Sequence, residues 1–410
     1  MPSRDLLEDD DVRRWYENMA RSSEATAEKN LRLLARYCRL ENVNPQAIVT
    51  ALQEDRKAFL DGFMDFVEAQ RKGVGAKGQV RAASYLREYG VTLSSWVRHH
   101  GLEWPRGIKY GDTSATPTLQ DERIPSKEQL RAIFHRASPR ARAIIALMAF
   151  SGLRPQVIGN AKGTDGLRLG DVEGFTVDGE VTIQKIPVLV RVRRELSKIR
   201  KPYFTFLAEE GAEIVRAYLQ SRLDAGEELT LDSPVVRVTP GYEYKGTRTD
   251  APNSGSPFLV TGNIRLDVSK AFGKTFRQRP YVLRSYFDTN LLYVEAKIGL
   301  PRDFRVFWMG HKGDMEARYT TAKPLPPDLV EEMRTAYHRA EPYLSTVSLM
   351  GEGREIYATD VSSEKYSVLV TNQQPEWADR SDQEKLRALM IRALREDEVL
   401  RAALRDALKD

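Results

Sequence analysis

Apolar side chains recur every three or four positions near the start of the chain, which is the spacing of one helix face. The first such positions are Ala27, Leu31, Leu34 and Cys38. Ser22 and Ser23 precede them and are residue types that favour helix N-caps. This pattern predicts a helix over this stretch and begins a helical region that we expect to extend to about residue 108.

Further helices are predicted downstream in the same region. Pro45 is suited to the first turn of a second helix, which continues through the apolar positions Phe59, Phe63 and Phe66. A third and a fourth helix are predicted from the positions Val80, Ala83 and Leu86, then Leu93, Trp96 and Val97. We therefore expect residues 1–108 to form a helical N-terminal domain.

A polar segment with the composition of a linker follows over residues 109–123, and a second domain is predicted over 124–345. Ser126 and Gln129 have the spacing of a capping box, so a helix is expected to start there. The apolar stretch Ala141–Phe150 predicts another helix, which ends at Ser151-Gly152.

Alternating and β-branched residues predict a small sheet in the middle of this second domain. Asp178-Gly179 favours a tight hairpin within 175–183, and Val188, Val190 and Val192 alternate along the next strand. A basic turn over 198–201 then leads to a strand at 203–206. We expect a three-stranded antiparallel sheet, so the predicted fold class is mainly α with a small antiparallel β-sheet.

Helical patterns return after the sheet, over 208–225 and within 259–276. The last part of the chain, 346–410, is predicted to be a C-terminal extension. It ends in a charged helix over 381–410 that carries leucines on roughly one side.

Composition sets limits on the partners and on the compartment. The chain has 410 residues, with 63 basic against 58 acidic side chains, a net charge of +5 that permits a polyanion partner without requiring one. Basic residues are spread along the later part of the helical domain, where a DNA-binding face and an ordinary solvated face explain them equally well. The single cysteine, Cys38, excludes an internal disulfide. No apolar signal core or membrane-length segment is present, so a cytoplasmic location is expected.

Four residues in the second domain are candidates for phosphate chemistry: Arg154, Arg284, His311 and Tyr319. Arg284 stands among aromatic residues in a segment that resembles a buried helix, and a buried guanidinium requires an anion. The carboxylate of Asp288 and a bound phosphate would each satisfy it. Two arginines can clamp a phosphate, and a histidine can orient a group or exchange a proton.

A tyrosine nucleophile needs positive charge beside it. The free side chain has a pKa of about 10 and is a weak nucleophile at neutral pH. Nearby arginines would lower that pKa and stabilise the charge that develops on phosphorus. The leaving oxygen also needs a proton, for which Lys198 in the basic turn is our first candidate and Lys201 our second.

Other hydrolytic chemistries find little support. The five histidines show no HExxH spacing, and neither a Walker-type phosphate loop nor a Gly-x-Ser-x-Gly elbow occurs. We therefore expect neither a metal nor another cofactor.

Taken together, these residues resemble the tyrosine recombinase (phage integrase) family, in the style of its archaeal branch. Gly152-Leu153-Arg154 matches the first arginine of that family, and Tyr281-Val-Leu-Arg284 matches its His-x-x-Arg, with tyrosine in place of histidine. Gly310-His311 and Tyr319 match the last two elements, and the turn with Lys198 matches the lysine. Two further departures are Val157 where an acidic residue is frequent, and a gap from His311 to Tyr319 that is one residue shorter than is common.

The resemblance implies a site-specific DNA recombinase or integrase that works through a 3′-phosphotyrosine. Double-stranded DNA would be its partner, and four protomers would act on two sites. Arg154, Arg284 and His311 would stabilise the transition state, Lys198 would protonate the leaving group, and Tyr319 would attack. Two alternatives stay open: a nicking-closing enzyme of topoisomerase IB type, and a non-catalytic DNA-binding protein derived from a recombinase.

Overall fold

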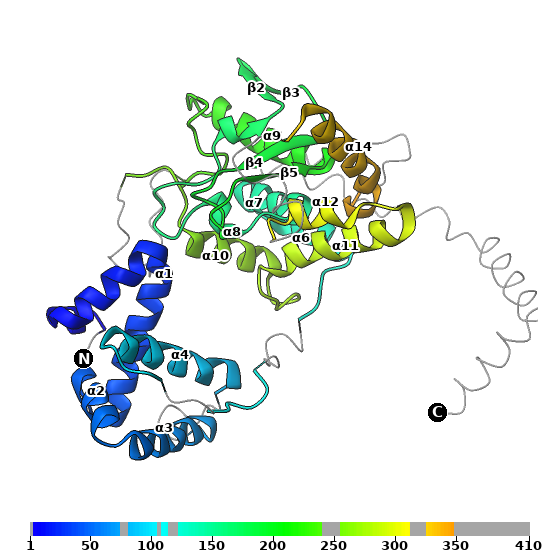
Figure 1. Cartoon of the computed structure of the whole chain (residues 1–410). Coiled ribbons are helices and arrows are strands. Elements are labelled where there is room, and N and C mark those ends of the chain that lie inside the picture. Colours follow the sequence, from blue (N-terminus) through cyan, green and yellow to red (C-terminus); the bar gives the residue numbers. More distant parts are fainter. Residues whose placement is uncertain are drawn as a thin grey trace, which may run out of the picture. The chain divides into compact units, whose positions relative to one another are not determined.

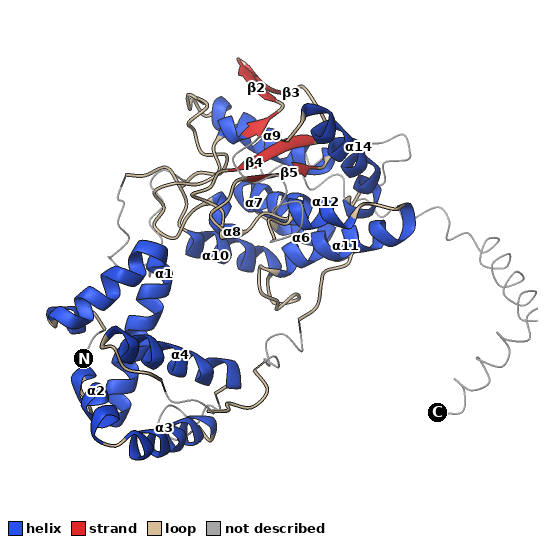
Figure 2. Ribbon diagram, viewed as in Figure 1, coloured by secondary structure: helices blue, strands red, loops and turns tan. Residues whose placement is uncertain are grey.

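A computed structural model of the chain describes residues 3–73, 81–104, 108–113, 122–239, 255–311 and 325–347 (Figure 1). Within these ranges the chain is mainly helical with one small sheet, as the sequence predicts (Figure 2). No described helix is long and apolar enough to cross a membrane. The predicted terminal helix over 381–410 lies outside the described residues.

The first group of helices closes around its own hydrophobic core. After a short 3-10 helix, η1 (Asp5–Glu8), its members are α1 (Asp10–Glu41), α2 (Pro45–Glu54), α3 (Arg56–Arg71) and α4 (Ala83–His99). The predicted apolar face of α1 is buried, and Phe63 and Trp96 are fully buried in the same core. This group has the helical character predicted for residues 1–108, while the domain boundary itself stays a prediction.

Three details of these helices differ from the expectation. The predicted second helix is two helices, α2 and α3, because Asp55 has an extended backbone and its side chain caps α3. α1 begins before Ser22, and its backbone is non-helical only at Ser23, whose hydroxyl accepts a hydrogen bond from the Thr26 N–H at 3.3 Å. Ser23 therefore caps the second half of a kinked helix. The predicted third and fourth helices are the single helix α4, because nothing between Leu86 and Leu93 breaks the helical pattern.

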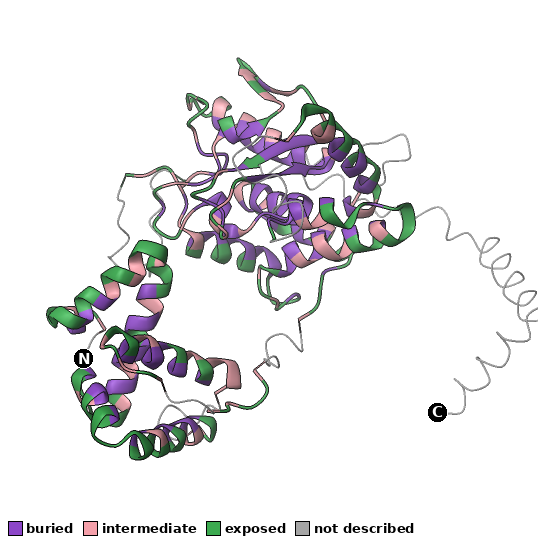
Figure 3. Cartoon of the chain, in the orientation of Figure 1, coloured by how far each residue is buried: buried purple, intermediate pink, exposed green. Residues whose placement is uncertain are grey.

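A second hydrophobic core lies within residues 130–344. Its helices are α6 (Lys127–Arg136), α7 (Pro139–Ser151), α8 (Pro155–Ile158), α9 (Glu209–Asp224), α10 (Thr261–Phe272), α11 (Val282–Ile298), α12 (Arg302–Trp308) and α14 (Pro327–Leu344). α7 is buried on nearly every side because α9, α10, α11 and the last strand of the sheet all pack against it (Figure 3). The helix that the sequence predicted from the apolar stretch Ala141–Phe150 is thus the centre of this core.

The sheet has five strands in the order β3-β2-β1-β4-β5, rather than the three that we expected. Their bounds are β1 (Val172–Glu173), β2 (Phe175–Asp178), β3 (Glu180–Ile183), β4 (Val188–Val192) and β5 (Tyr203–Leu207), and β1 follows a 3-10 turn, η2 (Leu169–Asp171). The hairpin at Asp178-Gly179 is confirmed, with Asp178 opposite Glu180. All pairs are antiparallel except β1 with β2. β1 is only two residues long, too short for an alternating pattern to reveal it.

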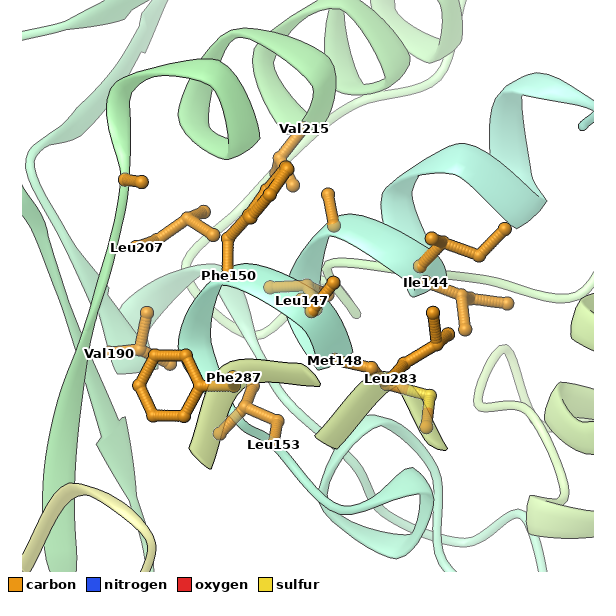
Figure 4. Close-up of a cluster of buried hydrophobic side chains, with 14 of the residues drawn as sticks. Ile144, Leu147, Met148, Phe150, Leu153, Val190, Leu207, Val215, Leu283 and Phe287 are labelled. Carbon is orange, nitrogen blue, oxygen red and sulfur yellow. The ribbon is translucent and has the colours of Figure 1, made fainter. Parts of the chain in front are cut away.

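The end of α7 is held in place from two neighbouring elements. In Figure 4, Phe287 of α11 and Leu153, which follows α7, lie close together beneath Phe150 and Leu147 of α7. The ring of Phe287 also packs on Gly152, where a Cβ atom would lie 2.8 Å from its Cε1. Gly152 ends α7 with φ +64°, a left-handed conformation that glycine adopts at little cost. This packing fixes the direction in which the chain leaves α7 toward Arg154.

Candidate active site

Arg284 joins two separate turns of the chain. Its side chain on α11 is fully buried and donates hydrogen bonds from Nη1 to the carbonyl oxygen of Gly152 and from Nη2 to that of Met309. The first carbonyl ends α7 and the second ends α12. A single guanidinium therefore brings the Gly-Leu-Arg turn and the Gly-His turn together, although 157 positions separate Gly152 from Met309 in sequence.

Arg154 reaches the same place from the start of α8. Both of its Nη atoms lie 3.4 Å from the carbonyl oxygen of Gly310, and its side chain is only partly buried. Arg154 and Arg284 are close enough that the charge of Arg154, together with burial, lowers the pKa of Arg284. The two predicted arginines thus converge in the structure.

Neither arginine has a carboxylate partner among the described residues. Asp288, the structural alternative for Arg284, accepts a hydrogen bond from Arg305 Nη1 at 2.6 Å instead. Arg305 is further bound to Glu295 at 2.9 Å. The acidic groups near α11 are therefore used by another arginine. Arg284 donates instead to backbone carbonyls and lies beside His311.

His311 stands beside Arg284 at the exposed edge of the site. Its Nε2 lies 3.3 Å from Nη2 of Arg284. A guanidinium has only donors, so this contact requires a bare Nε2 and places the ring proton on Nδ1. Partial desolvation and the charges of Arg284 and Arg154 lower the pKa of His311. The ring is therefore neutral at pH 7 and can offer Nδ1–H as a donor.

Gly310 is needed between Met309 and His311 for two reasons. Its φ is +54°, in the left-handed region. A Cβ atom there would also lie 2.6 Å from two ring carbons of Tyr203, the first residue of β5. The glycine of the Gly-His motif therefore allows an aromatic ring to pack directly on the turn.

Tyr281, which replaces the histidine of the family pattern, lies one turn before Arg284. Its side chain is 43% exposed. Burial and the charge of Arg154 lower the pKa of Arg284. Tyr281 and Tyr203 are near enough to Arg284 to oppose this lowering. A phenol at this position can donate a hydrogen bond but carries no positive charge at neutral pH.

The two remaining candidates are less closely tied to this cluster. Lys198 is exposed in the turn between β4 and β5. A hydrogen bond from the Arg200 N–H to the Ser197 carbonyl oxygen, 3.1 Å long, closes this turn. Nothing in the described part of the chain joins the amine of Lys198 to the arginines. Lys201, the second candidate, is half-buried at the end of the same turn. Tyr319 lies outside the described residues.

Tyr203 is a member of this cluster that the sequence did not reveal. Its hydroxyl is buried near both Arg154 and Arg284, whose charges oppose the rise in its pKa that burial causes. An aromatic residue that opens a strand is ordinary in a sequence, and only the long-range contact with Gly310 distinguishes it.

Metal chemistry has no ready site in the described ranges. No group of three or more His, Cys, Asp or Glu residues there is arranged to hold a metal ion. The cluster instead consists of guanidinium, phenol and imidazole groups, all of which can donate hydrogen bonds.

No protein-family model matches the sequence, and no curated protein sequence matches it. Solved structures do match this chain. The XerA recombinase is 18% identical over 80% of this chain and 98% of its own, with a TM-score of 0.31. The integrase from mycobacterium phage Brujita is 18% identical over 82% and 94%, with a TM-score of 0.34. The XerH site-specific recombinase, in a post-cleavage complex with a palindromic difH substrate, is 16% identical over 81% and 95%, with a TM-score of 0.42.

These structures are recombinases and an integrase. Their names agree with the family that the sequence motifs resemble. Identities and TM-scores are low in every case, so these likenesses carry no argument about the activity of this chain.

Proposed function

We propose that this chain is a site-specific DNA recombinase that cleaves and rejoins strands through a 3′-phosphotyrosine. The observation that supports it is the convergence of Arg154 and Arg284 without a carboxylate partner in the described part of the chain. Two like charges in a partly buried place repel each other, and a bound anion relieves that repulsion. The planar donor arrays of two guanidinium groups suit the oxygens of a phosphodiester.

The proposed reaction divides its tasks among five groups. The Tyr319 hydroxyl releases its proton to solvent as its oxygen attacks phosphorus and forms a new P–O bond, while the bond to the 5′ oxygen breaks. Lys198 gives a proton to that oxygen, which leaves as a 5′-hydroxyl group. Arg154, Arg284 and the Nδ1–H of His311 stabilise the negative charge on the non-bridging oxygens. A 5′-hydroxyl of a partner strand then attacks the phosphotyrosine, which regenerates the free tyrosine.

This chemistry conserves the energy of the phosphodiester bond in the covalent intermediate, so the proposal includes neither ATP nor a metal ion. Double-stranded DNA is the proposed partner, and four protomers on two DNA sites form the proposed working assembly. Binding of a duplex is expected to weaken with salt, because phosphate contacts release counterions.

A trapping experiment tests the proposal directly. The protein is incubated with nicked duplex DNA carrying candidate sites, without divalent metal, and a covalent protein–DNA adduct is sought on a denaturing gel. We expect an adduct that Tyr319→Phe abolishes and that Tyr293→Phe, which alters a tyrosine 59% exposed on α11, leaves intact. An adduct that survives in Tyr319→Phe would assign the attack to another residue.

A relaxation assay run beside the trapping experiment separates the alternatives. Relaxation of supercoiled DNA without a cognate site would indicate a nicking-closing enzyme of topoisomerase IB type. The absence of an adduct on every DNA that the protein demonstrably binds would instead indicate a binding protein without cleavage activity.

A further inference from the structure

Tyr203 connects the basic turn with the arginine pair. It opens β5 directly after the segment that carries Lys198 and Lys201. Its side chain is only 7% exposed, and its ring packs on Gly310 so closely that no Cβ would fit there. The carbonyl oxygen of this same Gly310 is the group that Arg154 approaches. The ring thus has little freedom to move without also moving the Gly-His turn.

The hydroxyl of Tyr203 lies in an unusual environment for a buried phenol. It has no hydrogen-bond partner of standard geometry in the described part of the chain. Arg284 and Arg154 are nevertheless near enough to oppose the effect of burial on its pKa. A buried polar group without a full bond is costly, and such groups are frequent at functional sites.

The chemistry of the three groups suggests what this hydroxyl does. Each guanidinium can only donate hydrogen bonds, whereas a phenol oxygen can also accept them. Tyr203 thus places a neutral acceptor near two cations that repel each other. The two guanidinium groups also contact backbone carbonyl oxygens, which belong to Gly152, Met309 and Gly310.

Building on the proposed function, we propose that Tyr203 is a positioning residue of the phosphodiester site. Its hydroxyl keeps the guanidinium groups of Arg154 and Arg284 directed at one point before DNA binds. The preorganised pair then meets the scissile phosphate without rearrangement, which favours the transition state. Because Tyr203 begins β5, the same contact also fixes one end of the turn that carries Lys198.

Tyr203→Phe is the variant that tests this role, because it keeps the ring on Gly310 and removes only the hydroxyl. We expect the single-turnover rate of adduct formation to fall about tenfold, while the affinity for DNA stays unchanged and the melting temperature does not fall. Tyr286→Phe is the matched control. It removes a buried hydroxyl on α11 that donates to the Leu344 carbonyl at 2.7 Å, and it should leave the rate unchanged.

A double-mutant cycle distinguishes positioning from a general structural effect. If the hydroxyl acts through Arg154, Tyr203→Phe should slow cleavage far less in an Arg154→Lys background than in the unmodified protein. Fully additive effects of the two substitutions on the rate would overturn the proposal.

A measurement that needs no cleavage keeps this inference separate from the proposed function. Tyrosine labelled with carbon-13 at Cζ gives one NMR signal per tyrosine, and Tyr203→Phe identifies the signal of Tyr203. We expect that signal to move in Arg154→Gln and also when inorganic phosphate is added to the unmodified protein. A signal that responds to neither change would overturn the inference. If the signal responds in a protein that forms no adduct, the positioning role of Tyr203 is supported and the proposed cleavage reaction is not.

Discussion

At the scale of single residues, the two motif glycines have distinct and checkable reasons to be glycine. Gly152 and Gly310 both have positive φ, and each has an aromatic ring packed where a side chain would begin. The conformational reason is shared with glycines elsewhere in the chain. Gly152 and Gly310 combine it with a closely packed ring, that of Phe287 and that of Tyr203 respectively.

Gly310→Ala separates these two reasons. We expect it to lower the free energy of unfolding by about 2–4 kcal/mol, of which the left-handed backbone contributes about 1–2 and overpacking against Tyr203 the rest. Gly226→Ala is the control, because Gly226 has φ +83° with nothing within 4 Å of a new Cβ. It should cost only about 1–2 kcal/mol in urea unfolding. Equal losses in the two variants would mean that Tyr203 moves aside without cost.

His311 reports on the charge of the arginine pair. Desolvation, Arg284 and Arg154 lower its pKa, so removing one positive charge should raise it toward the ordinary value of 6.5. We expect Arg154→Gln to shift the imidazole titration, followed by NMR, to higher pH. Arg140→Gln, which removes an arginine paired with Asp267 at 2.9 Å, should not. If His311 titrated alike in the unmodified protein, in Arg154→Gln and in Arg140→Gln, the charge of Arg154 would not act on its pKa.

At the scale of elements, an ion-pair network anchors the end of β4, from which the basic turn starts. Arg193 donates from Nη1 and Nη2 to the two oxygens of Asp165 at 3.0 and 2.9 Å, and from Nε to Asp171 at 3.0 Å. It also donates to the carbonyl of Gly166 at 2.7 Å. This network joins the loop before η2 to the strand that precedes Lys198.

The network makes stability depend on pH in acid. Burial raises the pKa of Asp165, but hydrogen bonds from Arg193 and the Gly166 N–H, with the charges of Arg193 and Arg168, lower it overall. A lowered pKa in the folded state means that the stabilisation is complete above the ordinary value of 3.8 and is lost as the pH falls below it. Urea unfolding above and below pH 3.8 should therefore show a steeper acid loss for the unmodified protein than for Asp165→Asn. Asp178→Asn, in the exposed hairpin, should keep the steep loss.

The elements show which features a sequence can reveal. Helix faces such as that of α1, the capping box at Ser126 and the hairpin at Asp178-Gly179 were predictable, because each depends on residues a few positions apart. The hydrogen-bond partners of Arg284 could not be predicted from the sequence. Backbone carbonyls leave no signature in a sequence, and Asp288, the carboxylate four positions away, is taken by Arg305, seventeen positions further along.

The candidate site divides in the same way. Arg154, Arg284 and His311 were found from short motifs, and the structure brings them together. Tyr203 joins them only through its contact with a glycine more than a hundred positions away, so no local pattern could identify it. Lys198 and Tyr319 stay predictions.

At the scale of the whole molecule, the described residues contain two hydrophobic cores that share no residue. One lies within 6–97 and the other within 130–344. The division into a helical domain, a linker and a second domain stays a prediction. Each core contains fully buried large side chains, among them Phe63 in the first and Phe134 in the second.

If the two cores unfold independently, calorimetry should resolve two transitions. Phe63→Ala should then lower only one of them and Phe134→Ala only the other, since each removes about 3–5 kcal/mol from its own core. Variants that shift a single common transition to the same extent would show that the chain unfolds as one cooperative unit.

The hydrogen bonds from Arg284 to the carbonyls of Gly152 and Met309 also affect local opening of the structure. Neither turn can separate from the other without exposing a buried cation and leaving a carbonyl without its donor. The two turns therefore form one unit of local opening, whose backbone amides should exchange with solvent deuterium together. We therefore expect Arg154 and His311 to lose their arrangement in the same opening event, because Arg154 follows one of these turns and His311 the other.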